Sequence, residues 1–179
     1  MVEPYSPETW HDFFLAIAGA AAALTGLLFV SLSLHVRYIA ASRNHRNTAR
    51  GSLIGLVLVL VISLVVLIRQ PATWTGLELA LVNLLYIVFL GAYQVSVFRR
   101  MSWKVPSTTL TRSGLGYLLA LAGMVGGYNL YVDTGAGLYL IAFQVISIVV
   151  WNLRNAWFLL MSVADQDLAR AGSSRAGGG

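Results

Sequence analysis

The feature of this sequence that most limits how it can fold is a series of five long apolar segments. They occupy residues 13–36, 52–68, 79–98, 113–132 and 135–153. A helix rises about 1.5 Å per residue and the hydrocarbon core of a bilayer is about 30 Å thick, so roughly 20 apolar residues cross it. Because a helix pairs its own backbone polar groups, it is also stable in lipid. We therefore predict an all-α integral membrane bundle of five transmembrane helices.

The composition agrees with a membrane protein. Hydrophobic residues make up 58% of the chain and charged residues only 11%, whereas soluble domains carry about 25% charged residues. So few charges cannot cover a surface in contact with water, which excludes a soluble enzyme and a nucleic-acid-binding domain. We expect residues 1–171 to form a single transmembrane domain. The Gly- and Ser-rich segment 172–179 is predicted to be a disordered tail.

The distribution of basic residues predicts the orientation of the spans. Basic residues gather in the first and third connectors and after the fifth span: Arg37, Arg43, Arg46, Arg50, Arg99, Arg100, Lys104, Arg112, Arg154, Arg170 and Arg175. Positively charged connectors stay in the cytoplasm, so we expect the N-terminus outside and the C-terminus inside. The net charge of +5 then indicates contact with anionic lipid at the cytoplasmic face, and we expect no nucleic-acid partner. The frequent Arg, Ala and Gly are typical of a GC-rich bacterium, which places the chain in a bacterial plasma membrane.

Small residues mark the helix faces that are expected to pack closely. In lipid, helices associate where glycine and alanine let their backbones approach. The first and fourth spans carry such stripes: Gly19, Ala23, Gly26, Gly116, Ala120, Gly123 and Gly127. Whether these contacts form within one chain or between chains is left open by the sequence. The second span is almost entirely Leu, Val and Ile, and we expect its body, including Val59, to face lipid.

Polar side chains form stripes on the third and fifth spans. They are Asn83, Tyr86, Tyr93, Gln94, Gln144, Ser147, Arg154 and Asn155. One interpretation is that the amides hydrogen-bond across helices and fix the register of the bundle. The other is that the stripes line a hydrated path or a small-ligand cavity.

Arg154 follows the fifth span directly, and the sequence after it is again mostly apolar. Two arrangements are therefore open. In the first, the helix continues as an interfacial segment, with the guanidinium reaching lipid phosphate. Alternatively it stands up inside a larger assembly, with Arg154 turned inward toward Asn152, Asn155 or helix-end carbonyls.

Enzyme chemistry is not supported by the residues present. There is no cysteine, so thiolate metal sites and a cysteine nucleophile are excluded. The chain also lacks nucleotide-binding loops and the sequence motifs of hydrolases and metalloproteases. Glu8, His11 and Asp12 share one helical face and are weak candidates for a metal site or a pH-sensitive pair, and the favoured interpretation is a solvated helix start. We therefore expect a protein without catalytic residues, cofactor or metal.

Three segments resemble a known group of proteins. They read SPETWHDFF at 6–14, AAAALTGLLFVSLSL at 20–34 and WNLRNAW at 151–157. These segments are similar to small multi-spanning membrane proteins of actinobacteria that genomes often label as a modulator of the FtsH membrane protease. The resemblance implies a multi-pass membrane protein and transfers no catalytic or binding residues.

Two functions therefore fit the sequence. One is a non-enzymatic accessory or regulatory component that acts through helix–helix contacts with a larger membrane partner. The alternative is a homo-oligomeric ion channel or small-solute transporter, whose path would be lined by the polar stripes of the third and fifth spans.

Overall fold

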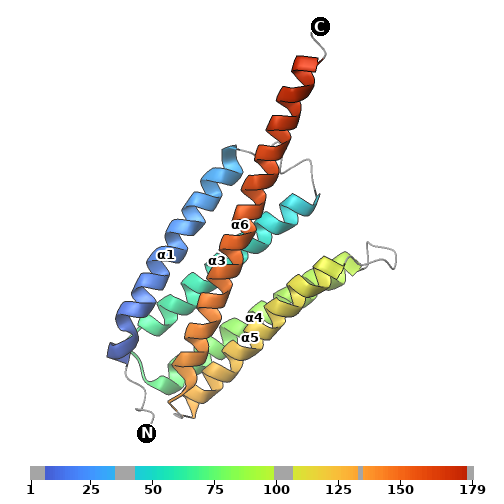
Figure 1. The fold of residues 1–179 in the computed structure, drawn as a ribbon. Helices are drawn as coiled ribbons and strands as arrows, with labels where there is room; N and C mark the ends of the chain where they lie inside the picture. The colour runs from blue at the N-terminus through green and yellow to red at the C-terminus, as the bar shows by residue number, and fades with distance from the viewer. Residues whose placement is uncertain (1–6, 35–42, 99–106, 133–134, 177–179) are drawn as a thin grey trace.

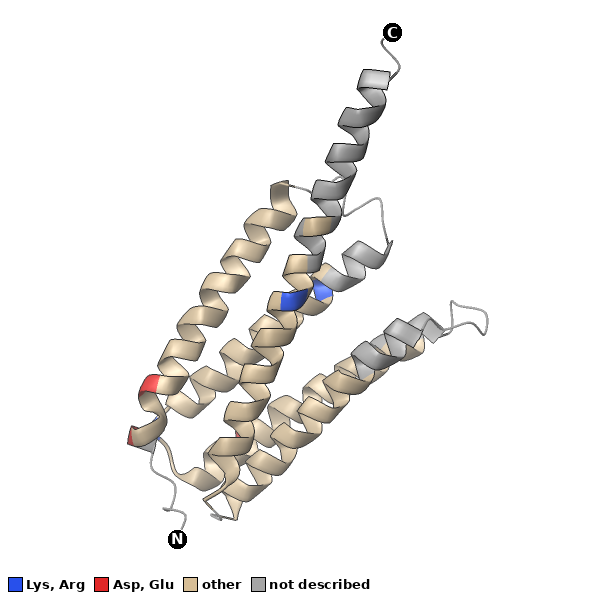
Figure 2. Ribbon diagram, viewed as in Figure 1, with Lys and Arg blue, Asp and Glu red and all other residues tan. Residues whose placement is uncertain are grey.

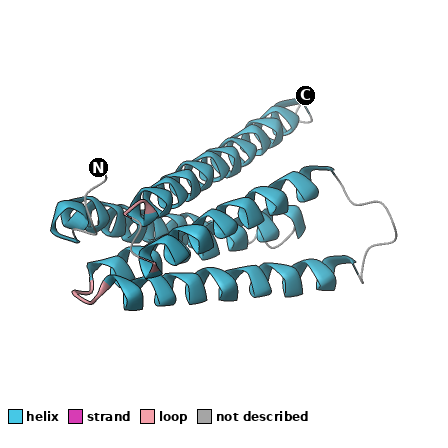
Figure 3. Ribbon diagram, turned by 90° about the horizontal axis from the view of Figure 1, so that it is seen from below, coloured by secondary structure: helices cyan, strands magenta, loops and turns pink. Residues whose placement is uncertain are grey.

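The part of the chain that the structure describes forms a bundle of five helices that run alternately up and down (Figure 1). The computed structural model describes residues 7–34, 43–98, 107–132 and 135–176. The helices are α1 (Pro7–Leu34), α3 (Arg43–Leu67), α4 (Ala72–Phe98), α5 (Ser107–Tyr131) and α6 (Gly137–Ala176). Within these ranges every regular element is a helix (Figure 3). The predicted all-α class is confirmed.

Proline and glycine set the ends of several helices. Pro7 is the first residue of α1, where its missing N–H leaves no helical hydrogen bond unmade. The carbonyl oxygen of Pro71 accepts hydrogen bonds from the backbone N–H groups of Trp74 and Thr75, at 3.0 and 3.2 Å, and these start α4. Gly135 has a φ of 74° just before α6, a conformation that glycine adopts without steric cost. The last two helices thus form the antiparallel pair expected from the sequence.

One face of the second apolar segment is buried in the bundle. Its helix, α3, packs mainly against α1 and α6 and makes a smaller contact with α4. Val59 and Ile62 are fully buried, and 44% of the α3 span is buried, compared with 22% in α1 and in α4. The prediction that the body of this segment, including Val59, faces lipid is therefore wrong for this face. A run of Leu, Val and Ile suits lipid and a packed core equally, so its composition does not distinguish them.

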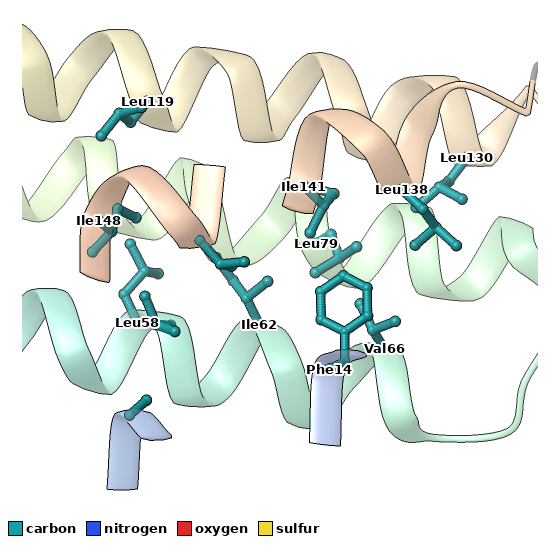
Figure 4. Packing of buried hydrophobic residues seen from close by; sticks show 13 residues of the cluster. Phe14, Leu58, Ile62, Val66, Leu79, Leu119, Leu130, Leu138, Ile141 and Ile148 are labelled. Carbon is teal, nitrogen blue, oxygen red and sulfur yellow. The ribbon is translucent and has the colours of Figure 1, made fainter. Parts of the chain in front are cut away.

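The core gathers side chains from all five described helices, with Leu119 and Leu130 contributed by α5. Phe14 of α1, Val66 of α3, Leu79 of α4 and Ile141 of α6 gather in one cluster (Figure 4). Phe14, Leu79 and Ile141 are fully buried. The ring centroids of Trp10 and Tyr139 lie 4.8 Å apart in an edge-on contact. This contact joins the start of α1 to the start of α6.

Helices α4 and α5 form a hairpin whose backbones approach very closely. A Cβ atom at Gly127 would lie 2.8 Å from the carbonyl oxygen of Gly76. At Gly116 it would lie 3.2 Å from a methyl group of Leu90. Ala120 is fully buried. The small-residue stripe of α5 therefore packs inside this chain, mainly against α4.

Four helices of the described chain are long and apolar enough to cross a membrane. The candidate spans are Glu8–Leu34, Ala49–Leu67, Ala72–Ala92 and Gly137–Trp157. Helix α5 is not among them, because its glycines, tyrosines and Asn129 lower its mean hydropathy. Large hydrophobic side chains are exposed on every helix, including Phe29, Leu64, Leu85, Leu118 and Phe143. A multi-pass membrane protein accounts for such an apolar exterior.

Within α1, α3 and α6, acidic and basic residues lie at different levels of the bundle. In the described part of the chain, Figure 2 shows acidic residues at the end where α1 begins and basic residues further along α3 and α6. Helix α6 has 40 residues and continues through Arg154 to Ala176 without interruption. It therefore projects beyond the other helices (Figure 1). Its last turns lie in the segment 172–179 that the composition predicts to be disordered.

Candidate functional site

The polar stripes of α4 and α6 meet at one point deep inside the bundle. Gln144 Nε2 donates a hydrogen bond of 2.6 Å to Asn83 Oδ1. Both side chains are fully buried. Asn83 Nδ2 in turn donates to the backbone carbonyl oxygen of Leu79 at 2.9 Å. Because buried amides are costly without partners, this pair fixes how α4 and α6 are placed relative to one another.

Helix α5 completes this contact through a residue that has no side chain. A Cβ atom at Gly123 would overlap Gln144 Oε1 and lie 2.5 Å from Asn83 Oδ1. Gln144 Oε1 is buried and has no hydrogen-bond partner among the described residues. It faces the Cα of Gly123, where a weak Cα–H···O contact is available. We call Asn83, Gln144 and Gly123 the polar node.

Two further residues of the α4 stripe, Tyr86 and Gln94, face α5. Tyr117 donates its hydroxyl to Gln94 Oε1 at 3.0 Å. The hydroxyl of Tyr86 lies 3.7 Å from the position of a Cβ at Gly116. The side chain of Tyr93 lies outside the described residues. Sequence reasoning missed Tyr117, although a phenol beside the small-residue stripe of α5 needs a polar partner in a helix interface.

Further along α6, polar residues lie against α3 and make a second close helix contact. A Cβ atom at Gly55 would lie 2.6 Å from Asn152 Nδ2, which donates to the carbonyl oxygen of Ile148 at 2.8 Å. Asn155 is also buried, while Ser147 is half-buried. Sequence reasoning named Asn152 only as a possible partner of Arg154.

Arg154 lies on the surface of the bundle. Its side chain is exposed, and its Cζ atom lies 3.9 Å from the centroid of the Trp151 ring. This is the distance of a cation–π contact. In the single chain this side chain faces outward, and the inward-turned arrangement, which was expected only inside a larger assembly, stays a prediction.

The small-residue stripe of α1 also lies on the surface. Gly19, Ala23 and Gly26 are all exposed. A Cβ atom at Gly19 or Gly26 would meet no other atom within 4 Å in the described structure. Unlike the stripe of α5, this stripe therefore does not pack against another described helix of the same chain.

The acidic start of α1 does not form a metal centre. His11 Nδ1 lies 3.2 Å from Asp12 Oδ1, with the two side chains 48% and 101% exposed. Glu8 is also exposed. No group of three His, Asp or Glu side chains could hold a metal ion in the part of the chain that the structure describes. These residues form a solvated helix start.

Comparisons with known proteins add no family to this description. No family model matches the chain, and neither the curated proteins nor the solved structures include a match to it. The geometry alone therefore has to carry the functional argument. Its main features are neutral amides that join helices inside the bundle and an unoccupied small-residue face outside it.

Proposed function

We propose that this chain is a non-enzymatic accessory or regulatory protein of the bacterial plasma membrane. In this proposal all five helices cross the bilayer, the N-terminus is outside, and the C-terminus is cytoplasmic. Function is exerted through lateral contact with a helix of a larger membrane protein. The resemblance of segments 6–14, 20–34 and 151–157 to the actinobacterial group supports the same class.

The observation that carries this proposal is the exposed small-residue face of α1. Gly19, Ala23 and Gly26 share one side of a candidate membrane span, and no described helix of the chain covers them. A small-residue face lets another helix approach to van der Waals contact, and lipid tails gain little from such a flat surface. Because the face is apolar throughout, its partner is expected to be a transmembrane helix.

The polar side chains inside the bundle support an adaptor better than a channel. Asn83 and Gln144 are fully buried and bonded to one another, and Gln94 is bonded to Tyr117. Side chains that line a conducting path instead face water or an axis shared between copies. In this chain they join α4 to α6 and α4 to α5.

The lack of cysteine in the sequence allows a clean test by site-directed crosslinking. Gly19→Cys places a unique thiol on the α1 face, and Phe143→Cys places one on the exposed face of α6. A thiol-reactive photo-crosslinker is attached to each variant in native membranes. We expect the α1 position to yield one distinct membrane protein as the main product and the α6 position not to yield it.

A second readout separates the accessory role from the alternative, a homo-oligomeric channel or transporter. Mild oxidation of the Gly19→Cys variant tests whether two copies of α1 face one another. A disulfide-linked dimer as the main product would favour homo-oligomers and would contradict the accessory proposal. In a further variant, the crosslinker is attached at Ala23→Cys and Gly19 is replaced by leucine. Gly19→Leu should abolish the crosslinked complex, and it should leave the bundle folded because position 19 is open in the isolated chain.

A further inference from the structure

A single basic residue lies within the apolar outer face of α6. Val150, Leu153 and Trp157 are 61%, 57% and 61% exposed, and Arg154 is exposed among them. A guanidinium surrounded by lipid-facing side chains is costly within hydrocarbon. It is stable where phospholipid headgroups begin, because its stem lies in the apolar layer and its charge meets phosphate.

Helix α3 places a second basic residue, Arg50, at about the same depth in the bundle as Arg154. The candidate span of α3 begins at Ala49, next to the exposed Arg50, and the span of α6 ends at Trp157. Gly55 lies against Asn152 in this antiparallel pair. Arg50 and Arg154 are therefore within about one helical turn of one another along the bundle axis. Successive residues of a helix are about 100° apart, so Arg50 and Arg154 both point away from the α3–α6 contact, each on the outer side of its own helix. The two side chains would therefore meet different lipid molecules.

The contact with Trp151 prepares Arg154 to bind an anion. The indole is half-buried, and the Cζ atom lies 3.9 Å from its ring centroid. A guanidinium carries five N–H donors in its plane, and two of them match two phosphate oxygens while the cation–π contact with the ring is kept. The ring thus limits the rotamers of a long side chain before it binds.

From these observations we propose that Arg154 and Trp151 form a binding site for the phosphate group of an anionic phospholipid. Arg50 makes a separate phosphate contact at the same headgroup plane. The proposal rests on the membrane insertion proposed above, but it does not involve the α1 face. Failure of partner capture at α1 would therefore leave it unaffected.

Lipid binding can be measured on the delipidated full chain in a neutral detergent. Native mass spectrometry counts bound phosphatidylglycerol and phosphatidylcholine, and inorganic phosphate serves as a headgroup without acyl chains. The variants are Arg154→Gln, Arg154→Lys, Trp151→Leu and Arg50→Gln. Arg69→Gln is the matched control, because Arg69 is equally exposed but lies at the opposite end of α3.

We expect the wild-type chain to prefer phosphatidylglycerol over phosphatidylcholine. Arg154→Gln should lower phosphatidylglycerol affinity about fivefold, Trp151→Leu about two- to fivefold, and Arg50→Gln should remove a separate binding event. Arg154→Lys should keep most of the affinity, and Arg69→Gln all of it. The melting temperature without lipid should fall only slightly in the Arg154 variants, since the side chain is exposed and its contact with Trp151 lies on the surface.

Three results would overturn the proposal. The first is equal retention of both lipids by the wild-type chain. The second is an equal loss of affinity in Arg69→Gln and Arg154→Gln, which would indicate general charge attraction. The third is equal binding of inorganic phosphate, which would assign the site to a soluble anion.

Discussion

Gln144 and Asn83 are 61 residues apart in the chain, yet the amide of Gln144 donates a 2.6 Å hydrogen bond to Asn83 Oδ1 in the fully buried interior. The bond joins α6 to the α4–α5 hairpin. Gly123 permits it, because any side chain on α5 at this point would occupy the space of the two amides. The polar node therefore sets how the hairpin docks on the rest of the bundle.

A double-mutant cycle on this pair tests that role. Asn83→Leu and Gln144→Met each leave one buried amide without its partner, and each should lower stability by about 1–2 kcal/mol. The double variant removes both amides, so its loss should be clearly smaller than the sum of the two single losses. The measurement is the free energy of unfolding in detergent. Strictly additive losses would show that the two amides do not depend on one another.

Glycine substitutions test the difference between the α5 and α1 stripes. Gly123→Ala should lower stability by about 1–3 kcal/mol, because the new methyl group overlaps the polar node. Gly19→Ala should raise it slightly, since the added methyl group meets no atom within 4 Å and alanine favours the helix. Thermal unfolding of both variants in the same detergent gives the comparison. Equal losses would mean that α1 is covered in the purified protein.

Two valines on α3 provide a test of which face of this helix is buried. Val59 is fully buried and Val57 is 47% exposed. Val59→Leu adds a methylene group to a filled core and should lower stability by about 1–3 kcal/mol. Val57→Leu makes the same chemical change on the surface, and its melting temperature should stay within experimental error. The opposite order would restore the interpretation that this part of α3 faces lipid.

The helices themselves follow from the sequence because their signals are local. The apolar runs predict the five helices, and α1, α3, α4 and α5 end within two residues of the predicted ends. These four helices begin six to nine residues before their apolar runs, and α6 continues 23 residues beyond its run. The antiparallel pairing of α5 and α6 also follows, because their connector is short. In α4, Thr73, Trp74 and Thr75 interrupt the apolar pattern but extend the helix toward its N-terminus.

The packing could be predicted only in part, because lipid and protein interior select the same side chains. Asn83 and Gln144 were recognised as residues of two stripes, and the cross-helix interpretation of these amides describes their contact. The angle at which two helices dock decides which residues of their polar stripes meet. The periodicity of the sequence carries no information about this angle. Val59 was assigned to lipid, and Gly19 and Gly123 carry the same local pattern. Only the tertiary arrangement separates the buried glycine from the exposed one.

The proposed orientation predicts which ends of the helices can be labelled from outside the cell. Thr73→Cys is exposed at the start of α4 and should react with a membrane-impermeant maleimide on intact spheroplasts. A reporter fused after Ala176 should be active only in the cytoplasm, because basic connectors remain there. Protection of Thr73→Cys together with an external reporter would invert the topology. Finding position 73 and the C-terminal reporter on the same side would exclude an odd number of spans after Thr73.

The most direct test of the accessory role is the composition and symmetry of the assembly extracted from native membranes into lipid nanodiscs. Single-particle imaging of tagged full-length chain shows what contacts α1 and whether the polar node lies inside one chain. The account predicts one bundle bound through the Gly19–Gly26 face of α1 to a helix of a different membrane protein. A symmetric ring of copies around a hydrated axis lined by Gln144 and Asn155 would contradict it and would favour the channel.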